Sequence, residues 1–101
     1  MLLIEKLDYK FEDGVKKKHE VIVYALSTCG FCKACLKFLK DNKVAFKYVY
    51  YDLLEPATKD AVKNDLNIKY KERIMFPFVV IDGKRVVVGM KEDELKKLLE
   101  L

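Results

Sequence analysis

Apolar residues recur along the chain with two different periods, which together predict alternating strands and helices. Short apolar runs at residues 21–26, 46–53 and 78–81 predict β-strands. Between the first two runs, residues 30–41 carry apolar side chains on one side of a helical projection and lysines on the other, which predicts an amphipathic helix. The apolar stripe of this helix consists of Phe31, Cys35, Phe38 and Leu39.

Two prolines indicate where the next helix and the third apolar strand begin. Pro56 suits a first helical turn, and we expect the helix that it opens to run to about Leu66. Residues 67–76 show neither period and predict a loop. Pro77 then directly precedes the third apolar run, so the loop should separate a helix from a strand.

The C-terminal part of the chain predicts a hairpin and a last helix. Asp82-Gly83 favours a tight turn, so residues 85–88 should pair with the strand before them, and a helix is expected from about Lys91. From residue 21 the order is therefore β-α-β-α-β-β-α. This order predicts an α/β fold with a four-stranded mixed sheet flanked by helices, in which the first two strands are parallel.

The first twenty residues predict a β extension to that domain. Residues 3–11 alternate with period two, which is typical of a half-buried strand with Leu3, Leu7, Tyr9 and Phe11 on one face. Asp13-Gly14 favours a hairpin turn, after which residues 15–20 would pair back. We therefore expect residues 1–20 to form a strand or hairpin that is not an independent unit, beside a main domain of residues 21–101.

Two cysteines stand at the junction between the first main-domain strand and the first helix. Residues 29–32 read Cys-Gly-Phe-Cys. A helix N-terminus favours the thiolate of Cys29, and the helical turn holds Cys32 within reach to close a disulfide. Because no histidine or acidic residue is adjacent in the sequence, we expect a modest lowering of the Cys29 pKa. The spacing predicts a dithiol–disulfide redox centre.

A third cysteine leaves two interpretations of the motif open. Cys35 lies on the apolar stripe, which favours a buried and inert thiol. The spacing C-x2-C-x2-C also occurs in iron–sulfur proteins, so an iron–sulfur or metal-binding module is the alternative function. Against it, no fourth cysteine exists, and Cys35 points about 120° away from Cys29 around a helix. His19, the single histidine, is expected to be a surface residue rather than a zinc ligand.

Three segments of the chain resemble one known family. Residues 24–32 contain the cysteine pair, residues 75–83 contain the proline and the Asp-Gly turn, and residues 88–90 contain a glycine. Their order and separation resemble those of the glutaredoxins and glutaredoxin-like small redoxins of the thioredoxin-fold superfamily. The resemblance covers residues 21–101, about four fifths of the chain.

The resemblance implies a role for each of these residues. Cys29 would be the attacking thiol and Cys32 the resolving thiol, so both are candidate catalytic residues. Pro77 would be the family's cis-proline that faces the dithiol, and the backbone of Phe76 would pair with an extended substrate segment. The candidate substrate-binding residues are Phe31, Met75, Phe76, Pro77, Gly89 and Met90.

Positions that help to hold glutathione in the family differ in this chain. Leu26 stands where a lysine is common, and the familiar Thr-Val-Pro and Gly-Gly become Met75-Phe76-Pro77 and Gly89-Met90. We expect an apolar rim of Phe31, Met75, Phe76 and Met90 around the dithiol, which suits protein disulfides. Alternatively, Lys69, Lys71 and Arg73 would hold a carboxylate of a small thiol.

Composition and charge narrow the class of protein. With 101 residues the chain forms one domain, and its 20 basic and 16 acidic residues are interspersed, so we expect no nucleic-acid partner. No apolar stretch approaches the roughly 20 residues of a membrane helix, and the N-terminus is charged too soon for a signal peptide. We therefore expect a cytoplasmic protein without a membrane partner.

The sequence thus predicts a cytoplasmic dithiol–disulfide oxidoreductase that reduces protein or small-molecule disulfides by thiol–disulfide exchange. The expected partners are disulfide-containing proteins or small thiols, and a reductase as electron donor. No bound cofactor or metal is expected, and glutathione, another small thiol or a thioredoxin-type reductase are alternatives for the reductant. A redox-inert docking domain is a third hypothesis, which the intact cysteine motif disfavours.

Overall fold

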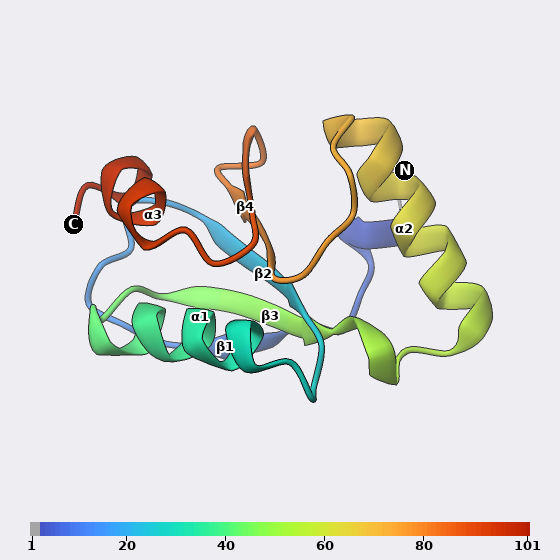
Figure 1. The fold of residues 1–101 in the computed structure, drawn as a ribbon, viewed down its shortest axis with the longest axis horizontal. Helices are drawn as coiled ribbons and strands as arrows, with labels where there is room; N and C mark the ends of the chain where they lie inside the picture. The colour runs from blue at the N-terminus through green and yellow to red at the C-terminus, as the bar shows by residue number, and fades with distance from the viewer. Residues whose placement is uncertain (1–2) are drawn as a thin grey trace.

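The computed structural model describes residues 3–101, which form a mixed β-sheet with helices on both faces (Figure 1). The predicted order β-α-β-α-β-β-α from residue 21 is confirmed. Two short 3₁₀ helices and one further strand add to it. In chain order the elements are η1 (Leu3–Glu5), β1 (Lys10–Glu12), β2 (Val21–Ala25), α1 (Gly30–Asp41), β3 (Phe46–Tyr50), η2 (Tyr51–Leu53), α2 (Pro56–Tyr70), β4 (Phe78–Ile81), β5 (Arg85–Val88) and α3 (Glu92–Leu99).

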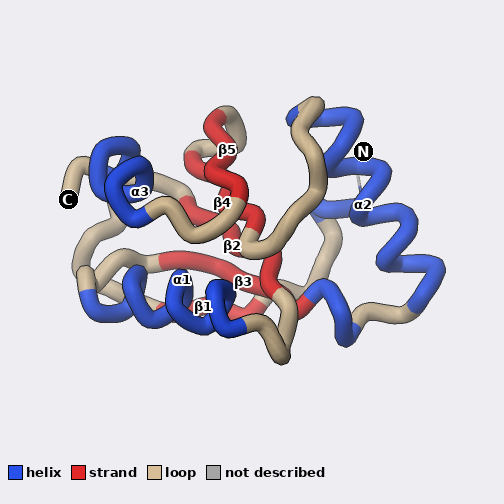
Figure 2. The backbone as a smooth tube through the Cα atoms, in the orientation of Figure 1, coloured by secondary structure: helices blue, strands red, loops and turns tan. Residues whose placement is uncertain are grey.

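The sheet has five strands in the order β1-β3-β2-β4-β5, which Figure 2 shows in red. β2 lies at its centre, parallel to β3 and antiparallel to β4. In this register Tyr24 stands opposite Val49 of β3 and Phe78 of β4. β5 continues the sheet as an antiparallel hairpin with β4, and β1 pairs antiparallel with the outer edge of β3.

A hydrophobic cluster covers each face of the sheet, because the side chains of successive strand residues alternate between the two faces. α1 and α3 cover one face, and α2 with η1 covers the other (Figure 1). The first cluster includes Val23, Cys32, Cys35, Leu39, Phe46, Val79 and Leu95. The second includes Ile4, Tyr24, Val49, Val62, Leu66 and Phe78. The cysteine motif lies at the end of the sheet where β2 ends and α1 begins.

The predicted hairpin within the first twenty residues is wrong. Of the residues described there, only Lys10–Glu12 forms a strand, and it pairs with β3 rather than with residues 15–20. Ile4, which the alternation placed on the other face from Phe11, is buried, whereas Phe11 is 63% exposed. Met1 and Leu2 lie outside the described residues. The alternation of apolar and polar residues predicted the wrong buried face here, because a 3₁₀ turn at residues 3–5 changes which side chains face the sheet.

Two further boundaries differ from the prediction. The strand predicted over residues 46–53 ends at Tyr50, and η2 takes its last three residues. The helix that Pro56 opens continues to Tyr70 instead of ending near Leu66, so the predicted loop begins only at Lys71, whose left-handed backbone ends the helix. In the part of the chain that the structure describes, every helix is too short or too polar to cross a bilayer.

Candidate functional site

The cysteine pair lies where the central strand passes into the first helix. Cys29 is the N-cap of α1, with extended backbone, and its Sγ accepts a hydrogen bond from the Cys32 backbone N–H at 3.2 Å. An N-cap side chain satisfies a helix donor that would otherwise lack a partner. Cys29 is half-buried, whereas Cys32 is 0% exposed and accepts a hydrogen bond on its Sγ from the Leu26 N–H at 3.4 Å. All three cysteines are free thiols.

These surroundings shift the two thiol pKa values in opposite directions. The pKa of Cys29 is lowered, chiefly because the Cys32 thiol donates a hydrogen bond to it, with help from the backbone N–H groups of Cys32 and Phe31. Burial raises the pKa of Cys32 to about 12, and its role as donor to Cys29 adds to that rise. The pair therefore consists of one partly exposed thiol that ionises readily and one buried thiol that keeps its proton.

The third cysteine lies outside the hydrogen-bonded pair of Cys29 and Cys32. Cys35 is fully buried in the α1–α3 cluster, and burial raises its pKa to about 12. This agrees with the interpretation of Cys35 as an inert core residue. Over residues 3–101, no three His, Cys, Asp or Glu side chains are grouped so that they could hold a metal ion.

A proline turn lies beside the same end of the sheet. The Phe76–Pro77 peptide bond is cis, as the resemblance implied, and the Pro77 carbonyl accepts a hydrogen bond from the Gly89 N–H at 2.8 Å. Phe76 and Met90 pack against the cluster that contains the cysteine pair, and so does the half-buried Cys29. The structure thus brings Phe76, Gly89 and Met90 to the part of the molecule that holds the dithiol.

Two members of the expected apolar rim are exposed. Phe31 is 71% exposed on the first turn of α1, and Met75 is 52% exposed in the loop before Pro77. Large apolar side chains exposed beside a reactive group are available to contact another molecule. Lys69, Lys71 and Arg73, the alternative carboxylate-binding set, are exposed as well, at and after the end of α2.

Sequence reasoning missed an acidic residue beside the cysteine loop. Asp52 of η2 accepts a hydrogen bond from the Ser27 N–H at 2.8 Å and another from the Ser27 hydroxyl at 2.5 Å. These hydrogen bonds hold the pKa of Asp52 below its usual value. No acid is adjacent to the cysteines in the sequence, but Asp52 follows the strand parallel to β2. Parallel strands end at the same edge of a sheet, so a residue that follows β3 can lie beside the loop that follows β2. This relation is the signal that could have identified Asp52.

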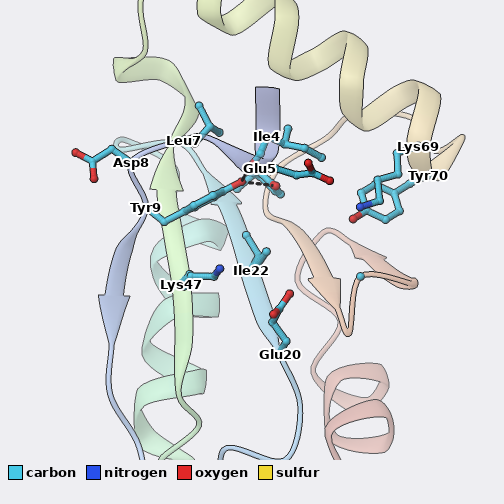
Figure 3. Close-up of a pocket in the computed structure, with 12 residues that line it drawn as sticks. Ile4, Glu5, Leu7, Asp8, Tyr9, Glu20, Ile22, Lys47, Lys69 and Tyr70 are labelled. Carbon is cyan, nitrogen blue, oxygen red and sulfur yellow. Dashed lines mark hydrogen bonds between the residues drawn. The ribbon is translucent and has the colours of Figure 1, made fainter. Parts of the chain in front are cut away.

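A large hollow lies elsewhere in the structure, between η1, β2 and α2 (Figure 3). Its volume is about 570 Å³, and none of the described residues that line it is a cysteine. The Tyr9 hydroxyl there donates to the Ile4 carbonyl at 2.6 Å and lies 2.8 Å from the Tyr24 hydroxyl. Lys47 lies over the Tyr9 ring. The two tyrosine hydroxyls and Lys47 thus interact with groups of the hollow itself.

Comparison with known proteins places the chain among glutaredoxins. The sequence pattern of the glutaredoxin family matches residues 21–86. The fold is similar to that of the glutaredoxin from Methanosarcina mazei Go1, with a TM-score of 0.80 and 33% identity over 92% of this chain and 88% of that one. Methanosarcina acetivorans methanoredoxin gives a TM-score of 0.78 and 31% identity, covering 87% and 90%.

A third similar structure is the glutaredoxin from Archaeoglobus fulgidus, with a TM-score of 0.72 and 34% identity over 83% of this chain and 89% of that one. No curated protein matches the chain significantly. The α/β architecture of these structures is the thioredoxin-like fold that the resemblance implied. The sheet of this chain has one strand more than the four predicted, the edge strand β1.

Proposed function

This chain belongs to the glutaredoxin family, and from that premise we propose that it is a dithiol–disulfide oxidoreductase that uses Cys29 and Cys32. The observation that carries the proposal is the contrast between the two thiols. Cys29 caps α1 with a lowered pKa, and Cys32 lies buried behind it with a raised one. That contrast is what a reaction with one attacking and one resolving thiol requires.

The reaction proceeds in two exchange steps. The Cys29 thiolate attacks one sulfur of a substrate disulfide, forms a mixed disulfide and releases the other sulfur as a thiolate. Cys32 then loses its proton and attacks the Cys29 sulfur, which releases the second substrate thiol and leaves a Cys29–Cys32 disulfide. Two electrons pass to the substrate. Two electrons from an external thiol or a reductase restore the free thiols, so no bound cofactor takes part in the cycle.

We propose that disulfide-containing proteins and small disulfides dock on the apolar rim. The exposed Phe31 and Met75, with Phe76 and Met90 behind them, offer apolar contact at the end of the sheet that carries Cys29. The backbone of Phe76, next to the cis-proline Pro77, would pair with an extended substrate segment, and Gly89 would line the same docking face. A cytoplasmic location fits this proposal, because thiols are kept reduced there.

Reduction of insulin disulfides by the purified protein tests the proposal. We expect activity in the wild-type chain, complete loss in Cys29→Ser, and little change in the matched control Cys35→Ala. Running the assay with glutathione, glutathione reductase and NADPH, and separately with NADPH and thioredoxin reductase, identifies the electron donor. Absence of reduction with either donor, and of any acceleration over the uncatalysed reduction by dithiothreitol, together with a visible absorbance band from iron and sulfide, would instead establish the cluster-binding alternative.

A further inference from the structure

One short turn contacts both loops of the candidate site. η2 follows β3, and its Asp52 carboxylate reaches the loop between β2 and α1, where one oxygen accepts from the Ser27 N–H and the other from the Ser27 hydroxyl. Its Tyr51 ring lies against the Phe76 ring, with centroids 5.0 Å apart, beside the proline turn. Tyr51 is itself held, because its hydroxyl donates to the Lys59 carbonyl at 3.0 Å.

The loop that Asp52 holds makes one backbone contact with each cysteine of the pair. Ser27 directly follows Leu26, whose N–H donates to the Cys32 sulfur at 3.4 Å. The Leu26 carbonyl accepts a hydrogen bond from the Cys29 N–H at 3.3 Å. A displacement of Ser27 would therefore move the backbone contacts of both cysteines, although Ser27 itself donates to Asp52 and not to a sulfur.

Asp52 is well suited to hold this loop. Both hydrogen bonds to it are charge-assisted, which makes them stronger than bonds between neutral groups. The only basic group that contributes to its lowered pKa is Lys59, and that contribution is the smallest. The carboxylate is therefore held mainly by Ser27 and not by an ion pair.

We propose that Asp52 is a positioning residue for thiol–disulfide exchange: by accepting both hydrogen bonds from Ser27, it fixes the loop backbone that donates to the Cys32 thiol and accepts from the Cys29 N–H. This inference rests on the exchange function proposed above and adds a residue to it. Asp52 neither gains nor loses a covalent bond in the reaction. Its effect reaches the sulfurs mainly through Leu26 and the N-terminal end of α1, and its negative charge makes a small direct contribution that raises the pKa of Cys32.

The test compares Asp52→Ala, Ser27→Ala and the double variant with wild type. The readouts are the rate of Cys29 alkylation by iodoacetamide from pH 5 to 10, followed by mass spectrometry, and the rate of insulin reduction. We expect Asp52→Ala to raise the apparent pKa of Cys29 and to slow insulin reduction by about fivefold to tenfold, which is less than the direct loss of a charge-assisted hydrogen bond would give, because Asp52 acts through the loop backbone. Ser27→Ala should act in the same direction with a smaller effect.

Two comparisons separate positioning from general damage. Because Asp52 and Ser27 act as one unit, the double variant should be no slower than Asp52→Ala alone. Asp52→Asn, which keeps an oxygen acceptor for the Ser27 N–H, should recover most of the rate. The matched control is Asp41→Asn, which removes the same charge at the opposite end of α1, where Asp41 pairs with Lys37, and should leave the Cys29 titration unchanged.

Several results would overturn the proposal. It is wrong if the Cys29 titration of Asp52→Ala coincides with that of wild type while thermal unfolding shows both to be folded. It is also wrong if the losses of the two single variants multiply in the double variant, or if Asp52→Asn is as slow as Asp52→Ala. Alkylation needs no disulfide substrate. If wild type failed to reduce disulfides, the proposed function would fall while the titrations still tested the positioning role.

Discussion

Three thiols within seven residues of one helix have three different environments. Cys29 is half-buried at the helix N-terminus, Cys32 is buried beneath the loop backbone, and Cys35 is buried in the apolar core. Because only the thiolate is a nucleophile, these environments set reactivity. The burial of Cys35 was predictable from the 3.6-residue period. The Ser27–Asp52 contact was not, because its partners are 25 positions apart and no local pattern joins them.

At the residue scale we predict the order and pH dependence of alkylation in the folded, reduced protein. Cys29 should react fastest, and its rate should rise with pH through a midpoint below that of an ordinary cysteine, because its folded pKa is lowered. Cys32 and Cys35 should stay nearly unreactive below about pH 10, because burial raises their pKa values to about 12. Mass spectrometry of peptides after timed iodoacetamide treatment measures all three.

Denatured protein is the control for that experiment, since its three cysteines should react at similar rates. Equal labelling of the three thiols in the folded protein would contradict the difference in burial that the structure shows between Cys29 and the other two. Faster labelling of Cys35 than of Cys29 would contradict it as well.

At the element scale, the N-terminal segment is held to the domain by a close backbone approach at Gly14. The Lys16 N–H donates to the Lys43 carbonyl, and the Ala45 N–H donates to the Lys16 carbonyl, both at 3.0 Å. A Cβ atom on Gly14 would lie 2.6 Å from the Lys43 carbonyl oxygen. The glycine is therefore required by packing, and not by the hairpin turn that the Asp-Gly dipeptide suggested.

We predict that Gly14→Ala destabilises the protein by about 1–3 kcal/mol, because the backbone of the α1–β3 connection must move to admit the methyl group. Urea unfolding followed by circular dichroism measures the change. The matched control is Gly30→Ala, because a Cβ atom there would meet nothing within 4 Å. Equal free energies of unfolding for Gly14→Ala and wild type would show that this segment is not packed as described.

The main-domain elements were predictable because each has a strong local signal, whereas the first twenty residues were not. Strands β2 and β4 are continuous apolar runs, and α1 has a clear apolar stripe. The alternation in residues 3–11 is equally regular, but its partner is the distant strand β3. Pairing with a distant strand edge is a tertiary interaction, which overrides the local preference for a hairpin.

At the scale of the whole molecule, His19 joins three parts of the chain. Its Nδ1 lies 2.7 Å from the Asp82 carboxylate in the β4–β5 turn, and its Nε2 lies 2.6 Å from the Glu100 carboxylate after α3. Lys18 also pairs with Glu100, at 2.8 Å. A neutral imidazole donates only one hydrogen bond, so bonding to both carboxylates favours the imidazolium. His19, which was expected to be a surface residue, therefore has two acidic partners that lie far from it in the sequence.

We predict that this cluster stabilises the fold between about pH 5 and the raised folded pKa of His19. Hydrogen bonds that His19 donates to Asp82 and Glu100 raise that pKa above its ordinary 6.5, so the contribution of His19 is fully present below pH 6.5 and is lost as pH rises through the folded pKa. The two carboxyl pKa values are lowered, so their contributions are lost on acidification through the folded values. The melting temperature of wild type minus that of His19→Gln should therefore be largest near pH 5.5–6.5 and shrink above it.

His19 is the single histidine, which simplifies this measurement. Asp41→Asn serves again as the control, because the exposed Lys37–Asp41 pair contains no histidine. A difference in melting temperature that stayed constant from pH 5.5 to 9 would show that the imidazolium does not hold the three segments together.

The additional strand β1 has a consequence for how the molecule behaves beside its own copies. Without it, β3 would be the outer strand and would present unpaired peptide groups flanked by Phe46, Tyr48 and Tyr50. Exposed strand borders of this kind recruit further strands and lead to aggregation. β1 replaces that border with three residues, of which Lys10 and Glu12 carry opposite charges. A protein shortened to begin at residue 20 would retain its cysteine pair but would be more prone to self-association and loss from solution.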